Sequence, residues 1–190
     1  MRTLFFTGRG DKGKSEVGGN GFSKGDPAFE LLGGLDELNS FLGFARAEAK
    51  KNPPAGGAFS VGSTLKRLQE LLFIAQAETA ARAFRHRSAE FQKIMPGHVA
   101  ELEEVITEVD RAVPPLTAFV IPGENELSAR LDLARTAARR AEREAVRNEK
   151  ALTLSPDFLR FLNRLSSALF ALARYASHEK EVKEDSPGYK

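Results

Sequence analysis

The sequence predicts an all-α fold, a single five-helix antiparallel bundle preceded by a glycine-rich N-terminal loop. Five segments place apolar residues three and four apart, the period of a helix that buries one face. Proline and glycine residues separate these segments, and strands do not alternate with helices as an α/β domain requires. A chain of 190 residues, 42% of them hydrophobic, can bury the core of one such domain.

Three parts of the chain differ in composition. Seven of the 16 glycines lie in residues 1–26, so we expect a loop there whose backbone can approach a ligand closely. Residues 27–180 carry the helical pattern and are expected to form the bundle. Residues 181–190 are polar, and we expect them to be a disordered tail.

The first four helices are bounded by local signals. Asp26 can cap a helix that begins at Pro27 and extends to about residue 50. The second helix is expected at about 61–85, after a break rich in proline and glycine. The third and fourth helices are expected at about 99–113 and 126–148.

The fifth helix has the clearest pattern. Ser155 and Pro156 mark its start, and it is expected to extend to about His178. Its apolar residues alternate at spacings of four and three for more than two heptads, which is typical of a bundle seam. These residues are Phe158, Leu162, Leu165, Leu169, Leu172 and Ala176.

Composition excludes several classes of function. The 28 Lys and Arg residues nearly balance 26 Asp and Glu, so we expect no nucleic-acid partner; the alternative is a bundle that binds a phosphate backbone through the arginines of the predicted fourth helix. The chain has no cysteine, so thiolate catalysis and cysteine-ligated metals are excluded. The apolar run near the N-terminus covers only residues 4–6, too short for a signal peptide or a membrane span. We therefore expect a cytoplasmic protein without a membrane partner.

Residues 8–15 read GRGDKGKS and match the P-loop pattern GxxxxGK[ST]. A P-loop needs a helix at the end of this motif, because the helix N-terminus holds the phosphates. The glycines at 18 and 19 argue against a helix there. We expect glycine amides and nearby lysines to bind phosphates without a P-loop fold. A flexible charged arm is the alternative.

The predicted fourth helix carries a stripe of arginines. Arg135, Arg139 and Arg143 are four residues apart and so share one face, where acidic groups or phosphates must compensate their charge. A solvated face with salt bridges inside the helix is the alternative. Asn163, in an apolar stretch of the fifth helix, favours a functional site, because an amide without partners is costly there.

Taken together, these segments resemble the PduO-type ATP:cob(I)alamin adenosyltransferases over about residues 3–177. The resemblance rests on five motifs in order: TGRGDKG at 7–13, GLDELN at 34–39, FVIPG at 119–123, AR at 134–135 with RRAER at 139–143, and FLNRLS at 161–166 with LARY at 172–175. It implies a ferritin-like, cobalamin adenosyltransferase-like bundle and a homotrimer with active sites between subunits. The implied reaction transfers the 5′-deoxyadenosyl group of ATP to cob(I)alamin and releases triphosphate.

The resemblance also implies roles for particular residues. Asp36 would pair with Arg135 near the corrin ring, and Phe119 would press on the lower face of the corrin; with Arg139 these are the expected catalytic residues. Mg²⁺ would bind with ATP, with Glu142 as a candidate ligand, and no cluster of protein side chains alone is expected to hold a metal. The expected ATP-binding residues are Thr7, Gly8, Arg9, Gly10, Asp11, Lys12, Gly13, Ser15, Lys24, Arg139, Arg140, Glu142, Arg143 and Asn163.

Further partners and alternatives follow from the same resemblance. A reductase that donates electrons and a cobalamin-dependent acceptor enzyme are implied as partners. Gly8-Arg9, Glu124 and Ser167 depart from the usual family pattern. A non-catalytic relative that binds ATP or a corrinoid for delivery or sensing is therefore the alternative function. For Phe119, the alternative is a buried connector between two helices.

Overall fold

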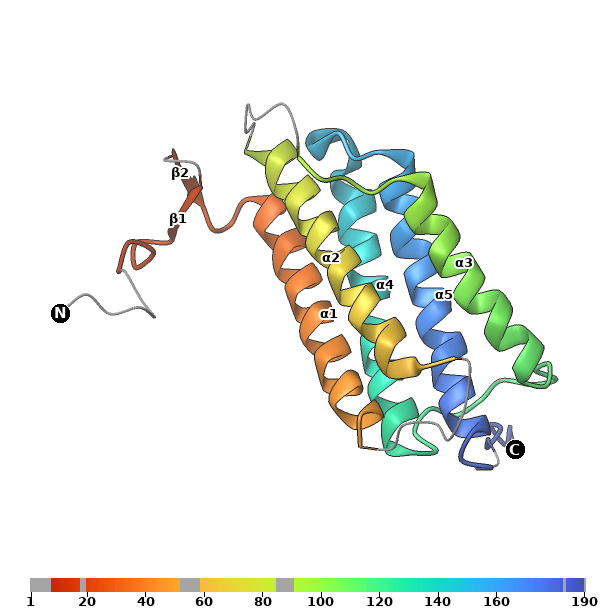
Figure 1. Cartoon of the computed structure of the whole chain (residues 1–190). Coiled ribbons are helices and arrows are strands. Elements are labelled where there is room, and N and C mark those ends of the chain that lie inside the picture. The colour runs from red at the N-terminus through yellow and green to blue at the C-terminus, as the bar shows by residue number, and fades with distance from the viewer. Residues whose placement is uncertain (1–7, 18–19, 52–58, 85–90, 183, 190) are drawn as a thin grey trace.

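The computed structural model describes residues 8–17, 20–51, 59–84, 91–182 and 184–189. Over these residues the chain forms five helices and one small hairpin, which confirms the predicted helical bundle (Figure 1). In order, the elements are β1 (Lys14–Val17), β2 (Asn20–Ser23), α1 (Pro27–Ala49), α2 (Val61–Ala83), α3 (Pro96–Ala112), α4 (Glu126–Leu152) and α5 (Pro156–His178).

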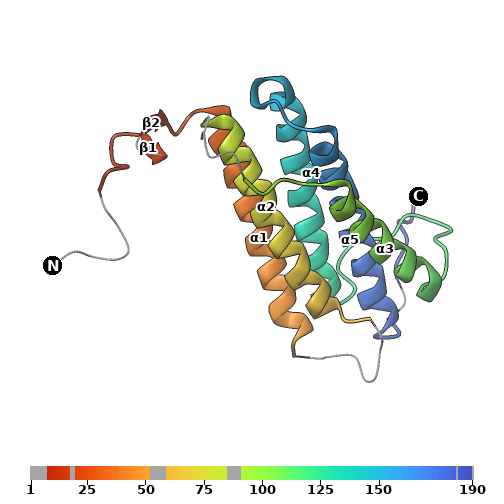
Figure 2. The same ribbon diagram turned by 45° about the horizontal axis from the view of Figure 1, so that its top comes forward.

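The helices form a compact arrangement in which α1 packs against α2 and α4, and α5 packs against α4 and α3 (Figures 1 and 2). Helices that follow one another in the sequence run in opposite directions. α3 and α5 are neighbours that run in the same direction, because α4 joins them in sequence but lies on the other side of α5 in space. Residues that lie equally far from the starts of α3 and α5 are therefore at the same height and can contact each other.

Capping residues explain most of the helix boundaries. The Asp26 carboxylate accepts a hydrogen bond from the Ala28 N–H at 2.9 Å, as expected for the start of α1. α3 begins at Pro96, three residues before the predicted start, because proline suits the first turn. α4 extends past the predicted end at 148 to Leu152, where Thr153 adopts a left-handed conformation with φ 52°.

The core contains the predicted apolar seam of α5, whose Phe158, Leu162 and Leu165 are fully buried. The side of α4 that faces the core is made largely of alanines. Small residues let α1 and α4 approach closely, and a Cβ added at Gly34 would lie 3.9 Å from the Cα of Ala141. Polar side chains on neighbouring helices are consequently within reach of one another.

The glycine-rich N-terminal segment contains an antiparallel hairpin in which Lys14 pairs with Ser23 and Ser15 with Phe22. It projects from one end of the bundle (Figure 1), and the Phe22 ring packs against the Phe84 ring with centroids 4.5 Å apart. Lys14 and Ser15 belong to a strand and do not open a helix. The prediction that this motif is not a P-loop is confirmed.

The described residues of the C-terminal tail form hydrogen bonds to other parts of the chain. The Ile121 N–H donates to the carbonyl of Asp185 at 2.8 Å, and the Asp185 N–H donates to the Glu124 carboxylate at 3.0 Å. Arg174 also donates to the Glu184 carboxylate at 3.0 Å. These partners attach the described tail residues to α5 and to the segment 113–125 that connects α3 and α4.

Among the described helices, none combines the length and apolar character that crossing a membrane requires.

Candidate active site

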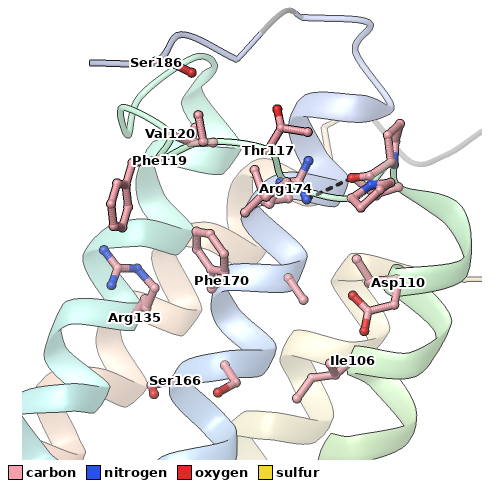
Figure 3. Close-up of a pocket in the computed structure, with 18 of the residues that line it drawn as sticks. Ile106, Asp110, Thr117, Phe119, Val120, Arg135, Ser166, Phe170, Arg174 and Ser186 are labelled. Carbon is pink, nitrogen blue, oxygen red and sulfur yellow. Dashed lines mark hydrogen bonds between the residues drawn. The ribbon is translucent and has the colours of Figure 1, made fainter. Parts of the chain in front are cut away.

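A cavity of about 1310 Å³ lies between α3, α4, α5, the connecting segment and the tail (Figure 3). Ile106, Arg135 and Phe170 line it from the three helices, Phe119 from the connecting segment and Tyr189 from the tail. Its volume exceeds the roughly 300–1,000 Å³ of pockets for drug-sized ligands. The cavity therefore suits a large ligand with substantial apolar surface.

Phe119 lies at the edge of this cavity and is 78% exposed, so the alternative of a buried connector is wrong. It lines the cavity together with Arg135 and Phe170, and Figure 3 shows the three side chains on the same side of it. The guanidinium of Arg135 lies 5.9 Å from the centroid of the Phe170 ring. Two aromatic rings and one cation thus form one side of the cavity, an arrangement suited to a flat ligand.

The predicted pair of Asp36 and Arg135 does not form within one chain. Arg135 Nε instead donates to the Asp132 carboxylate, one turn earlier on α4, at 2.8 Å. Asp36 is exposed on α1, which packs against α4, whereas Arg135 lies beside Phe170 of α5. A contact between Asp36 of one chain and Arg135 of another stays a prediction.

The arginines of α4 have separate environments. Arg139 is exposed and lines the cavity, while the Arg143 side chain donates to the Arg139 carbonyl at 3.1 Å. Arg140 turns toward α1, where it forms an ion pair with Glu37. Arg139 of the stripe therefore faces the cavity, whereas Arg140, outside the stripe, is anchored to α1.

Glu142 and Asn163, both predicted to bind ATP, meet across α4 and α5. The Asn163 Nδ2 donates to Glu142 Oε1 at 2.8 Å. Arg164 Nη1 donates to Asn163 Oδ1 at 3.0 Å. The amide predicted to need partners in this apolar stretch is exposed and has a partner on each side.

This polar cluster adjoins the cavity. Glu142 lies three residues beyond Arg139 on α4, a rise of about 4.5 Å along the helix axis. Asn163 lies three residues before Ser166, which lines the cavity from α5, and the Ser166 hydroxyl donates to the Asn163 carbonyl at 3.0 Å. Arg139 is thus positioned between the apolar cavity and the polar cluster.

The N-terminal segment forms a second group of predicted site residues. Gly13 has φ 70°, a conformation that strains other residues, and its carbonyl accepts from the Lys24 N–H at 2.9 Å. The Lys24 ammonium lies 3.0 Å from where a Cβ of Gly10 would be, so glycine permits this close approach. Arg9 forms an ion pair with Glu16 at 3.0 Å.

The remaining predicted residues of this segment lie in a turn, on the surface or in the strand β1. Gly8 has φ 70° and accepts a hydrogen bond from the Asp11 N–H at 3.3 Å, which makes a tight turn. Lys12 is exposed beside it, and Ser15 is half-buried in β1. Thr7 lies outside the described residues.

Figures 1 and 2 both show the hairpin projecting beyond the end of the bundle, with α1 and α2 between it and α4 and α5. The predicted ATP-binding residues therefore fall into two groups, one on the N-terminal segment and one on α4 and α5. A single chain does not bring the two groups together.

No group of three or more acidic or histidine side chains able to hold a metal occurs in the described part of the chain. His98 has a structural position, because its Nδ1 accepts from the Met95 N–H at 3.2 Å at the start of α3. His178 is exposed.

Three residues that touch the site were not predicted to belong to it. Arg164 and Glu103 extend the polar cluster to α3, and Arg174 donates to the Pro114 carbonyl at the start of the connecting segment. Arg164 directly follows Asn163, which was a visible signal. Arg174 lies in the LARY motif at 172–175, whereas Glu103 has no local signal, since its role depends on how the helices pack.

Comparisons with known proteins identify relatives of this chain. The family model for cobalamin adenosyltransferase matches residues 5–176. The corrinoid adenosyltransferase PduO of Citrobacter freundii is 37% identical over 92% of this chain, which spans 50% of that protein. A second corrinoid adenosyltransferase of Citrobacter freundii is 35% identical, with 93% of this chain and 97% of that protein covered.

A comparison with solved structures identifies the same family. A variant of the PduO-type ATP:corrinoid adenosyltransferase from Lactobacillus reuteri, solved with cobalamin and ATP, superimposes with a TM-score of 0.80 at 32% identity. The match covers 96% of this chain and 98% of that one. With a family model that spans most of the sequence and a common fold, the chain belongs to the cobalamin adenosyltransferase family.

Proposed function

We propose that the protein transfers the 5′-deoxyadenosyl group of ATP to cob(I)alamin, giving adenosylcobalamin and triphosphate. The observation that carries this proposal is the position of Arg139, between a large cavity with two exposed aromatic rings and a polar cluster on α4 and α5. The cavity suits a corrinoid, and the cluster suits the polar parts of ATP. The Lactobacillus reuteri relative solved with cobalamin and ATP supports this pair of substrates.

In this reaction cobalt(I) attacks the 5′ carbon of the ribose. A cobalt–carbon bond forms, the bond from C5′ to the triphosphate oxygen breaks, and its electron pair leaves with the triphosphate. The protein must therefore place positive charge where negative charge accumulates. Arg139 and Arg143 supply it from α4, and Lys12 and Lys24 supply it from the N-terminal segment, where glycine amides add hydrogen bonds.

Phe119 acts on the cobalt side of the reaction. Cobalt(II) is hard to reduce while a lower axial ligand donates electrons to it. An exposed ring at the edge of the cavity can cover the lower face of the corrin and exclude that ligand, including water. This favours the reduced metal.

Mg²⁺ fits as an ion bound mainly by the triphosphate. Mg²⁺ commonly binds one or two carboxylates together with substrate phosphates and waters, so a cluster of protein ligands is not required. Glu142 is half-buried, and its Oε1 accepts from Asn163, so Oε2 can face the ion. Bound there, Mg²⁺ would neutralise charge on the leaving group.

The complete site requires two chains. The N-terminal segment of one chain would supply Gly8, Gly10 and Lys24 to α4 and α5 of a neighbour in a homotrimer. The separation of these two groups within one chain supports this arrangement. Asp36 of the neighbour would then approach Arg135, in place of a contact inside the chain. A reductase that donates electrons, a cobalamin-dependent acceptor enzyme and a cytoplasmic location stay predictions.

One assay tests the activity. The protein is incubated with ATP, Mg²⁺ and chemically reduced cobalamin, and the spectrum is followed from cob(I)alamin to adenosylcobalamin. We expect complete conversion that depends on ATP. A folded protein that binds both ligands without conversion would instead be a non-catalytic carrier or sensor.

A mixing experiment tests the site between chains. One variant lacks residues 2–20, and the other carries Arg139→Ala; each alone should be inactive. Unfolded together and refolded, they should regain activity, because some sites would combine an intact N-terminal segment with an intact α4. If the mixture stays inactive although mixed trimers form, each site is built from one chain.

A further inference from the structure

The side chain of Asn163 lies between two ions of opposite charge. Its Oδ1 accepts from Arg164 Nη1 at 3.0 Å, and its Nδ2 donates to Glu142 Oε1 at 2.8 Å. Arg164 is itself bound by Glu103 of α3, whose Oε1 accepts from Nε at 2.8 Å. Four side chains thus form one continuous line across α3, α5 and α4.

The two ions determine which way the amide points. The oxygen and nitrogen of an asparagine side chain are similar in size, and rotation about its last bond has a shallow preference. The guanidinium of Arg164 favours the orientation in which the amide oxygen faces it, and the carboxylate of Glu142 favours the same orientation, because the NH₂ group then faces the carboxylate. The reversed amide would turn its NH₂ toward Arg164 and its oxygen toward Glu142, and both hydrogen bonds would be lost.

The parallel packing of α3 and α5 makes this arrangement possible. Glu103 and Arg164 are the eighth and ninth residues of their helices, so they lie at the same height. The two contacts of Arg164 use different nitrogens, Nε for Glu103 and Nη1 for Asn163. Glu103 therefore compensates the charge of Arg164 and also sets the direction of its guanidinium.

We propose that Arg164, held by Glu103, is a positioning residue that orients the Asn163 amide and through it the Glu142 carboxylate for ATP and its metal. This inference rests on the proposed function, in which Glu142 and Asn163 belong to the ATP site. Arg164 acts through Asn163 and need not touch the substrate. If the ion pair of Arg164 and Glu103 were purely structural, its removal would leave ATP binding unchanged. It would also change the stability of the fold only slightly, because exposed ion pairs of this kind contribute little to it.

The test compares the dissociation constant for Mg-ATP, kcat and thermal stability in a set of variants. Arg164→Met should weaken ATP binding by about tenfold, the loss expected for one charge-assisted hydrogen bond, with an unchanged melting temperature. The double variant Asn163→Ala with Arg164→Met should bind ATP no more weakly than Asn163→Ala alone, because Arg164 acts through Asn163. Additive losses would overturn the inference.

A charge exchange separates positioning from stability. Glu103→Arg with Arg164→Glu keeps an ion pair between α3 and α5 but places a carboxylate beside the amide oxygen. ATP binding should stay weak, and the side-chain NH₂ signals of Asn163 in a ¹⁵N spectrum should move. Recovery of ATP binding in this variant would show that the pair is only structural. The matched control exchanges Arg67 and Glu101, which join α2 and α3 at 2.8 Å, and should leave ATP binding unchanged.

Failure of the inference differs from failure of the proposed function. If Asn163→Ala weakens ATP binding but Arg164→Met and the charge exchange do not, the ATP site stands and the positioning role is wrong. If Asn163→Ala itself leaves ATP binding unchanged, the cluster on α4 and α5 is not the ATP site, and both fall.

Discussion

The two groups of predicted ATP-binding residues differ in how they are supported. On α4 and α5, the polar side chains hold one another across helices, as in the contact of Asn163 with Glu142. The N-terminal segment is held mainly by its own turns, such as the hydrogen bond from the Lys24 N–H to the Gly13 carbonyl. Its ring contact with the bundle is made by Phe22 and Phe84.

This difference separates two ways of building a site. The helical group is positioned by the packing that stabilises the fold, so its geometry exists in one folded chain. The N-terminal group has a defined local shape but must be brought to its target by assembly. Mutations in the first group should change binding at a preformed surface, whereas changes in the second should remove a component without unfolding the bundle.

The largest effect is expected from removing the N-terminal group. Deletion of residues 2–20 retains Phe22, so the ring contact with Phe84 survives and the melting temperature should fall by no more than about 4 °C. Turnover should be lost, because the glycine amides and Lys12 are gone. Calorimetry and the spectral assay check both outcomes, and an active truncated protein would show that α4 and α5 suffice.

Phe119→Ala is expected to have the next largest effect. The ring is 78% exposed, so stability should fall far less than the roughly 3–5 kcal/mol lost when a buried Phe becomes Ala. ATP binding should persist, while the spectrum of bound cob(II)alamin should lose the form without a lower ligand, and transfer should fail. The control is Phe73→Ala on α2, where a 63% exposed ring lies away from the cavity. An unchanged cobalt spectrum would remove Phe119 from the mechanism.

Arg139→Lys should cut turnover by about tenfold or more, because lysine keeps the charge but loses the planar fork that binds two phosphate oxygens. Its melting temperature should stay that of the unmodified protein, since Arg139 is exposed. Arg147→Lys on the same helix is the matched control, with its partner Glu144 one turn away. Equal activity in the Arg139 variant would show that the stripe is a solvated face.

The smallest effect is expected from an ion pair outside both groups. The Arg67 guanidinium holds the pKa of Glu101 below its ordinary value through a hydrogen bond. A lowered folded-state pKa stabilises the fold above the ordinary carboxyl range, and this stability is lost as the pH falls through the lowered pKa. Arg67→Met should thus cost less than about 1 kcal/mol at neutral pH, with normal turnover. In acid unfolding the difference should vanish; a constant difference at all pH values would contradict this.

Local signals predicted the fold well. Asp26 and Ser155 cap helices where expected, and the apolar seam from Phe158 onward is buried. The boundary errors have local causes as well. Pro96 starts α3 although Met95 is an unusual capping residue, and Thr153 ends α4 without a glycine or proline to mark the position.

The site was predicted less completely, because its contacts depend on packing between helices. Family motifs indicated Glu142 and Asn163, but not that they bind each other. Glu103 became a partner of Arg164 because α3 packs against α5. Arg135 forms an ion pair with Asp132, three residues earlier on its own helix, and this spacing can be read from the sequence. Spacing along one helix can be read from a sequence, whereas facing positions on two helices require the structure.

The attachment of the tail to the connecting segment has a consequence for how fast a ligand leaves the cavity. The bond from the Ile121 N–H to the Asp185 carbonyl and the bond from the Asp185 N–H to Glu124 join two segments that both line or border the cavity. Neither segment can lift away from the other while both bonds remain, so the two segments separate only when both bonds break, and no helix has to unwind. The amide protons of Ile121 and Asp185 should then exchange with solvent at a common rate, well above that of the α5 core. That rate would set the upper limit on the departure of a bulky product.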